Sequence, residues 1–253
     1  MFSFLKKTPS PPATPADYGA LQVDMHSHLL PGIDDGSPDM DTTLQLIRRL
    51  QAMGYRKLIT TPHIYWDYYR NTPAIIHEQL ALVRQALAAE GLDVELDAAA
   101  EYFLDEHFEQ ELQDDTLLTL PGRHVLVEMS FFAPYPNLHQ TLFNLRSAGY
   151  RPILAHPERY LYLADDFAQF DRIRSYGCAL QVNILSLSGH YGKPVKNLAL
   201  QLLEHNLVDF LGTDLHHARH ADTLDKLRQE SFFKRILEKH TFKNQEWLIN
   251  QTA

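Results

Sequence analysis

The chain has 253 residues, 45% of them hydrophobic, so it can bury a full-sized core, and α/β barrels of this length commonly form one domain. Its formal net charge of -9 argues against a nucleic-acid surface, because such surfaces need clustered Lys and Arg to neutralise phosphates. The single cysteine, Cys178, excludes an intramolecular disulfide and a cysteine-based zinc site, so any metal would have nitrogen and oxygen ligands.

The N-terminal residues are not expected to join the core. Residues 1–7 contain too short an apolar stretch for a signal peptide, and no run of the chain reaches transmembrane length. Residues 8–15 (TPSPPATP) are rich in proline, so we expect a disordered leader over residues 1–20 and one domain over residues 21–253. Together with the lone cysteine, these features favour a cytoplasmic protein that is not embedded in a membrane.

Seven apolar runs predict buried parallel strands, because they lack the alternation of strands that have one solvated face. They cover residues 21–25, 57–61, 94–99, 124–129, 152–155, 179–182 and 208–211. Amphipathic helical patterns lie between them, as in residues 40–53, where Gly54 follows at the position of a helix C-cap. A further helical pattern in residues 221–253 is expected to cover the barrel.

Polar residues of metal-ligand type follow most of these runs. The first strand ends in Asp24-Met25-His26-Ser27-His28, whose i, i+2 spacing points both imidazoles to one side of an extended segment. Such a pair alone is a weak signal in a chain with fourteen histidines. Asp34 and Asp35 follow in a loop where an acidic turn is the ordinary interpretation.

The next three strands end in further candidates. His63 closes the second run, where a hydrogen-bonded core histidine is the alternative, and Glu101 follows the third. Glu128 interrupts the apolar run of the fourth strand, where an unneutralised carboxylate would cost several kcal/mol. The alternative for Glu128 is a buried ion pair with an arginine.

Two later strands end in the same way, with His156 after the fifth and Asp214-Leu215-His216 after the seventh. Ligands at nearly every strand end favour a closed barrel over a doubly wound open sheet. In a barrel of parallel strands, side chains at the C-terminal strand ends converge on one mouth. The motif order therefore predicts a single polynuclear metal site.

Taken together, the motifs resemble the PHP (polymerase and histidinol phosphatase) superfamily, and more narrowly the bacterial tyrosine-protein phosphatases encoded with capsular or exopolysaccharide genes. The resemblance covers about residues 23–216 and is carried by MHSHLLPGIDDGSPDMDTTLQLIRRLQAMGYRKLITTPH, AAEYF, LVEMS, AHPERY and GTDLHH. It implies a distorted (β/α)7 barrel with three divalent ions, manganese by preference, with iron, zinc or magnesium as alternatives.

The resemblance also implies how the ligands divide. The first ion would be held by His26, His28, Glu101 and Asp214, the second by Glu101, Glu128 and His156, and the third by Asp35, His63 and His216. The spacing after the histidine pair selects Asp35 over Asp34.

Two arginines are candidates for binding phosphate during catalysis, namely Arg159 and Arg219. The alternatives are a structural pair with Glu158 for Arg159 and a surface salt bridge for Arg219. A cysteine mechanism is excluded, because a Cys-x5-Arg loop starting at Cys178 would need arginine where Ile184 stands. The aromatic cluster at residues 65–69 could stack on a substrate ring or simply pack together.

The resemblance implies a metal-dependent protein-tyrosine phosphatase that acts on a phosphotyrosine protein, a bacterial tyrosine autokinase controlling capsule or exopolysaccharide synthesis. One alternative is a small-molecule phosphoesterase such as a histidinol phosphatase. An alternative of another class is a non-catalytic, metal-stabilised regulatory module.

Overall fold

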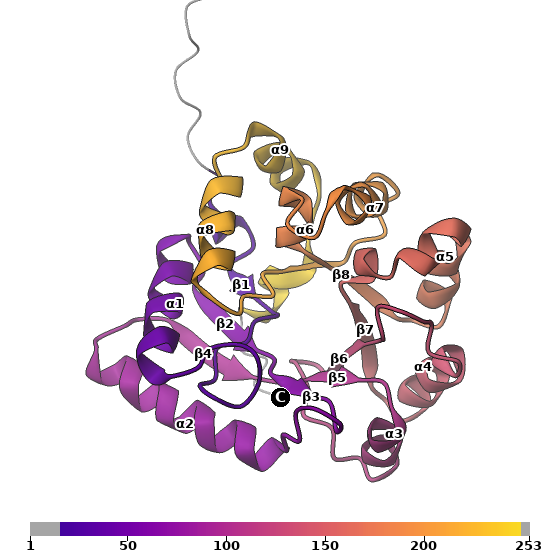
Figure 1. Cartoon of the computed structure of the whole chain (residues 1–253), viewed down its shortest axis with the longest axis horizontal. Helices are drawn as coiled ribbons and strands as arrows, with labels where there is room; N and C mark the ends of the chain where they lie inside the picture. The colour runs from indigo at the N-terminus through magenta and orange to yellow at the C-terminus, as the bar shows by residue number, and fades with distance from the viewer. Residues whose placement is uncertain (1–15, 249–253) are drawn as a thin grey trace, which may run out of the picture.

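The computed structural model describes residues 16–248, and within them it forms a parallel α/β fold (Figure 1). The strands are β1 (Val23–Asp24), β2 (Lys57–Thr60), β3 (His63–Ile64), β4 (Glu95–Ala98), β5 (Glu101–Phe103), β6 (His124–Glu128), β7 (Arg151–Ala155), β8 (Ala179–Asn183) and β9 (Phe210–Gly212). They pair in parallel in two sheets, of order β1-β2-β4 and β3-β5-β6-β7-β8-β9. The predicted parallel α/β class is therefore confirmed.

Each of the seven predicted runs contains a strand, and two of these strands are followed by a second strand just beyond a break. Thr61 and Pro62 separate β2 from β3, and Ala99 and Ala100 separate β4 from β5. Proline has no N–H to give to a ladder, which explains the first break. The second strand of each pair begins with a predicted ligand, and these two residues, His63 and Glu101, are register partners.

The first and last strand segments meet at a parallel bridge between Ser27 and Leu215. Two backbone hydrogen bonds support the bridge, from Asp214 N to His26 O at 2.8 Å and from His28 N to Leu215 O at 2.9 Å. The segments thus follow one another in chain order, which is consistent with a distorted (β/α)7 barrel, but the barrel itself stays a prediction. Their hydrogen bonding is divided between two sheets rather than forming one closed ladder.

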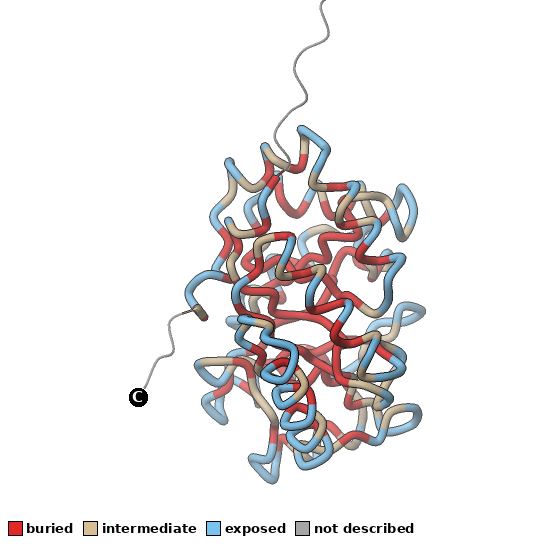
Figure 2. The backbone as a smooth tube through the Cα atoms, turned by 90° about the vertical axis from the view of Figure 1, so that its left-hand side faces the viewer, coloured by how far each residue is buried: buried red, intermediate tan, exposed pale blue. Residues whose placement is uncertain are grey.

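Helices surround the strands (Figure 1). They are α1 (Met40–Ala52), α2 (Pro73–Ala89), α3 (Glu106–Gln113), α4 (Leu138–Ser147), α5 (Ala168–Ser175), α6 (Ile184–Ser188), α7 (Lys193–Glu204), α8 (Ala218–Leu227) and α9 (Ser231–Lys239). Buried positions follow the strands and exposed positions the outer turns (Figure 2). Among residues 16–248 we find no helix long and apolar enough to cross a membrane.

Helix α1 shows why the predicted pattern folds as it does. The Asp39 side chain accepts a hydrogen bond from Thr42 N and so caps the first turn. Leu44, Ile47 and Leu50 are buried on one face, as their spacing predicts. The chain then leaves the helix through Gly54, whose φ of 107° suits glycine.

The fold begins earlier than the predicted boundary at residue 21. Tyr18 is fully buried, packs its ring against Phe233 and donates its hydroxyl hydrogen to Leu224 O at 3.1 Å. Residues 16–20 therefore belong to the domain and not to a leader. The rest of the predicted leader, residues 1–15, lies outside the described residues.

The C-terminal segment packs on the strands, as predicted for the part of it that is described. A short 3₁₀ helix, Lys243–Trp247, follows α9. Trp247 stacks on Phe210 of β9, with ring centroids 4.7 Å apart. Asn244 is buried and donates to Val23 O and Leu211 O, and it accepts from Leu211 N. Its side chain thus joins β1 to β9, which do not pair directly within their strand bounds.

Candidate metal centre

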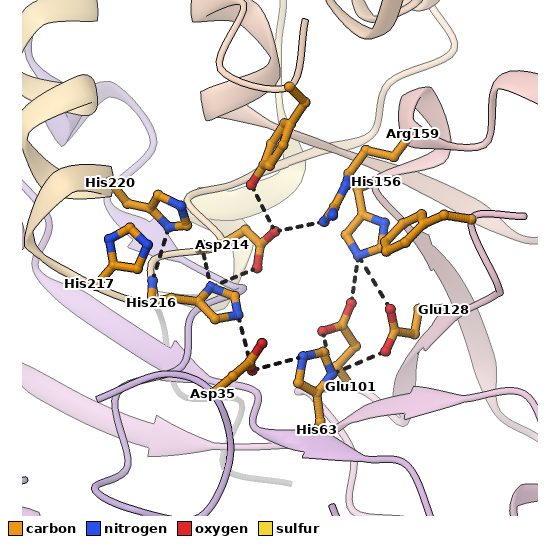
Figure 3. A pocket seen from close by; sticks show the side chains of 12 residues that line it. Asp35, His63, Glu101, Glu128, His156, Arg159, Asp214, His216, His217 and His220 are labelled. Atoms are coloured by element: carbon orange, nitrogen blue, oxygen red, sulfur yellow. Dashed lines mark hydrogen bonds and ion pairs between the residues drawn. The ribbon is translucent and has the colours of Figure 1, made fainter. Parts of the chain in front are cut away.

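All nine predicted ligands gather in one cluster, and seven of them line one pocket (Figure 3). They form four overlapping sets: His28, Asp35, His63 and His216; His26, His28 and Asp214; His26, Glu101 and His156; His63, Glu101 and Glu128. Within each set, one donor atom of each residue lies within 4.8 Å of the others. The convergence expected from the strand ends is present in the structure.

Glu101 lies at the centre of this arrangement. Its Oε2 atom is 3.1 Å from His26 Nε2 and 3.3 Å from His63 Nδ1, and its Oε1 atom is 2.8 Å from His156 Nε2. A carboxylate that faces donors on both sides has the geometry of a bridging ligand. The sets do not divide as the resemblance implied, because His26, His28 and His63 each belong to two of them.

Two of the candidate ligands have left-handed backbone conformations. His156 follows β7 with φ 34°, and Asp214 follows β9 with φ 51°. Non-glycine residues seldom adopt this region, and such strain is found most often at functional sites. Here it turns both side chains toward the pocket immediately after a buried strand.

In two of the histidines, a hydrogen bond at Nδ1 fixes the orientation of the ring. His28 Nδ1 lies 2.7 Å from Asp34 Oδ2, and His216 Nδ1 lies 2.9 Å from the backbone oxygen of Asp214. Since a carboxylate or carbonyl oxygen only accepts here, each Nδ1 carries the hydrogen. The lone pair of each Nε2 is then free to face the pocket, as in metal-ligating histidines.

The same contacts separate the roles of the two adjacent aspartates. Asp34 accepts hydrogen bonds from His28, from Gly36 N at 2.9 Å and from His63 N at 3.2 Å. It therefore positions candidate ligands and does not itself line the pocket. Asp35 lines the pocket, with its Oδ1 atom 3.4 Å from His63 Nε2 and 3.5 Å from His216 Nε2. The geometry therefore favours Asp35 as the ligand, as the spacing predicted.

The charges of the cluster depend on one another. Burial opposes the charged form of His26, but Glu101 and Asp214 raise its pKa above the usual value. Burial likewise opposes ionisation of Glu101 and Asp214, but neighbouring histidines, His26 first among them, hold the pKa of both carboxyls well below their usual range. When no metal is present, protons on the histidine rings thus balance the negative charge of the buried carboxylates. In metal sites, divalent cations balance this charge instead.

The donor set fits divalent cations. His63 Nδ1 is buried without a hydrogen bond and faces Glu101 and Glu128, at 3.3 Å and 3.1 Å from their oxygens. A buried nitrogen left in this way is satisfied by a cation held between it and the carboxylates. Imidazole nitrogens and carboxylate oxygens suit manganese, iron, zinc or magnesium to differing degrees.

Among the described residues that line the pocket, Arg159 is the only arginine or lysine (Figure 3). Its guanidinium lies between two aromatic rings, 4.0 Å from the centroid of Phe131 and 4.5 Å from that of Tyr191. Its Nη1 atom is 3.4 Å from Asp214 Oδ2. The alternative of a structural pair with Glu158 is not what the structure shows, because that carboxylate accepts hydrogen bonds from Asn183 N and the Ser186 hydroxyl.

Arg219 is not brought to the pocket. It is exposed on α8, whereas His217 and His220 of the same segment line the pocket instead. Burial and the neighbouring His217 and His216 lower the pKa of His220 to about 3, so this ring is neutral. A role for Arg219 in binding phosphate therefore has no support in the geometry.

The aromatic cluster at residues 65–69 is mostly packed. The ring of Tyr65 stacks on Phe103 at 3.9 Å, and that of Trp66 stacks on His107 at 3.8 Å. Tyr69 stacks on the ring of His63, so it supports a candidate ligand. Packing, one of the two interpretations left open by the sequence, accounts for these three residues.

Cys178 has none of the properties of a nucleophile. It is buried just before β8, at the end of that strand away from the pocket. Burial raises the pKa of its thiol to about 12, so the thiolate is not populated near neutral pH. The exclusion of a cysteine mechanism is in keeping with this environment.

Besides His217 and His220, two groups of residues at the site were not predicted from the sequence. Phe131 and Tyr191 flank Arg159, and nothing in their local pattern marked them. Gln181 and Asn183 lie beneath the pocket at the end of β8. The sequence could have indicated Gln181 and Asn183, because they are two polar residues at i, i+2 that end an apolar strand, as His26 and His28 do.

Residues 22–242 match the family model described as capsular polysaccharide synthesis, CpsB/CapC. The tyrosine-protein phosphatase YwqE of Bacillus subtilis (strain 168) is 29% identical and matches over 91% of this chain and 89% of its own length. The putative tyrosine-protein phosphatase CapC of Staphylococcus aureus is 25% identical over 77% of this chain and 76% of its own. The tyrosine-protein phosphatase CpsB of Streptococcus pneumoniae is 26% identical over 77% and 83%.

Solved structures are similar as well. One chain comes from the crystal structures of YwqE from Bacillus subtilis and CpsB from Streptococcus pneumoniae, described as unique metal-dependent tyrosine phosphatases. It has a TM-score of 0.79 and 28% identity, and the match covers 91% of this chain and 96% of that one. A histidinol phosphate phosphatase from Lactococcus lactis has a TM-score of 0.54 at 14% identity over 82% and 92%, which shows a shared fold alone.

Proposed function

Because the chain belongs to the capsular polysaccharide synthesis family CpsB/CapC, we propose that it is a metal-dependent protein-tyrosine phosphatase that uses no cysteine. The observation that carries the proposal is the convergence of nine residues with nitrogen and oxygen donors, seven of which line one pocket together with Arg159. The relatives that match most of this chain are themselves tyrosine-protein phosphatases.

The pocket would hold three divalent ions, manganese by preference. Divided as the resemblance implies, the proposed ligands are His26, His28, Glu101 and Asp214 for the first ion, Glu101, Glu128 and His156 for the second, and Asp35, His63 and His216 for the third. The same nine residues form the four overlapping sets described above. When bound, such ions lower the pKa of a coordinated water toward neutrality and offset the charge on phosphate oxygens. Asp34 and the backbone oxygen of Asp214 keep His28 and His216 in the ligating tautomer.

Arg159 is the side chain proposed to bind the phosphate directly. Its planar guanidinium can present two N–H groups to two phosphate oxygens. Phe131 and Tyr191 hold the plane between their rings, so little conformational freedom is lost when phosphate binds. A tyrosine phenolate has a pKa of about 10, far below an alkyl alcohol, so it leaves with less need for a general acid.

The proposed substrate is a phosphotyrosine protein, a bacterial tyrosine autokinase that controls capsule or exopolysaccharide synthesis, acted on in the cytoplasm. The family description supports the link to capsular polysaccharide. A histidinol phosphatase is the weaker candidate, because that neighbour shares the fold at 14% identity. A non-catalytic module is also weaker, because the relatives that match most of this chain are tyrosine-protein phosphatases.

The test compares substrates on metal-depleted protein before and after manganese is added. We expect phosphotyrosine peptide and p-nitrophenyl phosphate to be hydrolysed with manganese and not with chelator, and histidinol phosphate to be a poor substrate. Glu128→Gln should lose both metal and turnover, whereas the exposed Glu106→Gln, matched in chemistry, should lose neither. Faster turnover of histidinol phosphate would show that the substrate is wrong, and stoichiometric metal without turnover would favour the regulatory module.

A further inference from the structure

Two amide side chains on β8 contact candidate ligands of the proposed metal centre. Gln181 and Asn183 are both fully buried, on a strand that supplies none of the nine candidate ligands. Their neighbours Leu180 and Val182 pack in the core between strands and helices, so the two amides face the interior. Buried amides need partners for every donor and acceptor they turn away from water.

The partners of these amides are each other and two candidate ligands of the same ion. His26 Nδ1 lies 2.8 Å from Gln181 Oε1. Gln181 Nε2 donates to Asn183 Oδ1 at 2.9 Å, and Asn183 Nδ2 donates to Asp214 Oδ2 at 2.6 Å. The result is an unbroken series of hydrogen bonds from an imidazole to a carboxylate, which we call the amide relay.

The direction of every bond in the amide relay follows from its carboxylate end. Asp214 as a carboxylate can only accept, so Asn183 must present its NH₂ group there and its oxygen to Gln181. Gln181 must then present its NH₂ group to that oxygen, which leaves its own oxygen for His26. When the His26 ring is neutral, its hydrogen is therefore on Nδ1, and Nε2 keeps the lone pair that a metal would take.

The neighbouring strand leaves room for this arrangement. Gly212 of β9 is the register partner of Asn183. A Cβ atom at Gly212 would lie 2.8 Å from Gln181 Nε2 and 2.7 Å from His26 Cβ, which is closer than real Cβ contacts come. Glycine is needed at this position because Gln181 reaches His26 across it.

We propose that the amide relay positions two metal ligands at once, by holding His26 as the Nδ1–H tautomer and Asp214 in a single orientation. In that orientation Asp214 Oδ1 lies 3.4 Å from His26 Nε2 and 3.5 Å from His28 Nε2, so three donor atoms face one point. Gln181 and Asn183 are positioning residues and touch neither metal nor substrate. The inference rests on the proposed metal site and is independent of the proposed substrate.

The first test reads the tautomer in the metal-free protein. With ¹⁵N-labelled histidine at alkaline pH, we expect His26 to carry its hydrogen on Nδ1 in the parent and in Gln181→Glu, whose carboxylate still accepts from it. Gln181→Met removes the acceptor at similar volume, so the fraction of the Nδ1–H tautomer should fall. An unchanged tautomer in Gln181→Met would overturn the inference.

The second test reads metal affinity by competition with a chelator, using manganese. Asn183→Ala removes the donor to Asp214, and we expect affinity to fall about 10- to 100-fold, as for other supports of metal ligands. Asn183→Asp keeps the volume but sets a carboxylate against Asp214, so the loss should be at least as large. Gly212→Ala should weaken affinity by displacing Gln181.

The control is Thr141→Ala, which removes another buried polar side chain, one that bonds Glu109 away from the pocket. It should lower the melting temperature and leave manganese affinity unchanged. If the relay variants also keep the parent's affinity, the amides serve packing alone and the inference fails. If Asn183→Ala does not fold, Gln181→Met decides the outcome by its tautomer and Asn183→Asp by its manganese affinity. A parent chain that binds no manganese would refute the proposed metal site while the tautomer remains measurable.

Discussion

At the scale of single residues, Arg159 combines a fixed charge with a fixed orientation. Lysine at this position would keep the charge but lose the planar two-pronged contact and the fit between Phe131 and Tyr191. We predict that Arg159→Lys keeps its metal content, while inhibition by inorganic phosphate weakens about tenfold and KM for a phosphotyrosine peptide rises.

The control for this prediction is Arg70→Lys. Arg70 also lies over an aromatic ring, that of Trp66 at 5.7 Å, but it does not line the pocket. Its replacement should change neither phosphate inhibition nor KM. Parent-like phosphate inhibition in Arg159→Lys would show that this arginine is structural.

Cys178 gives the complementary residue-scale prediction. Because its thiol is buried at the far end of β8 and its pKa is raised to about 12, Cys178→Ser should keep near-full turnover and metal content. Unfolding free energy should fall by about 1–2 kcal/mol, since a more polar hydroxyl is buried. Denaturant unfolding and steady-state assays check both. Lost turnover in a folded, metal-loaded variant would revive a cysteine mechanism.

At the scale of elements, the 3₁₀ helix Lys243–Trp247 connects β1 to β9, two strands that do not pair with each other in either sheet. Asn244 satisfies Val23 O and both backbone groups of Leu211. We predict that Asn244→Ala lowers the unfolding free energy by about 2–4 kcal/mol, because buried backbone groups lose their partners. Asn144→Ala, which removes a half-buried amide of α4 whose hydrogen bond to Gln140 is exposed, should change it by less than about 0.5 kcal/mol. Equal effects of the two variants in urea would contradict this role.

The strand elements and the ligands were predictable because both are local signals. An apolar run followed by a ligand type is visible within about seven residues of sequence, and the convergence of His26, Glu101 and Asp214 then follows from parallel strands. The amide relay was not visible, because its meaning depends on which strand lies beside β8.

Two expectations that the geometry does not support also have physical causes. Arg219 was placed at the pocket because it follows His216 closely, but α8 has begun there and each helical residue turns by about 100°. His220 consequently faces inward and Arg219 faces solvent. Tyr18 was assigned to the leader because its partners Leu224 and Phe233 come from more than 200 positions later in the chain.

At the scale of the whole molecule, the ligand cluster links folding stability to pH in two opposite ways. The pKa values of His26, His28 and His63 are raised in the folded, metal-free chain. Their contribution to stability is therefore complete below the unfolded value of about 6.5 and is lost as pH rises through the folded values. The pKa values of Glu101 and Asp214 are lowered, so their contribution is present above about 4 and is lost as pH falls.

The metal-free protein should therefore be most stable between about pH 4 and pH 6.5, and it should lose stability toward alkaline pH. Bound metal requires neutral histidines, so the metal-loaded protein should lose its extra stability in acid, together with metal content and turnover. We predict that the melting temperature in manganese minus that in chelator grows from about pH 5.5 to about pH 8.5. His205→Gln, an exposed histidine away from the pocket, should leave this difference unchanged. A difference that is flat with pH would mean that the clustered histidines do not ligate the metal.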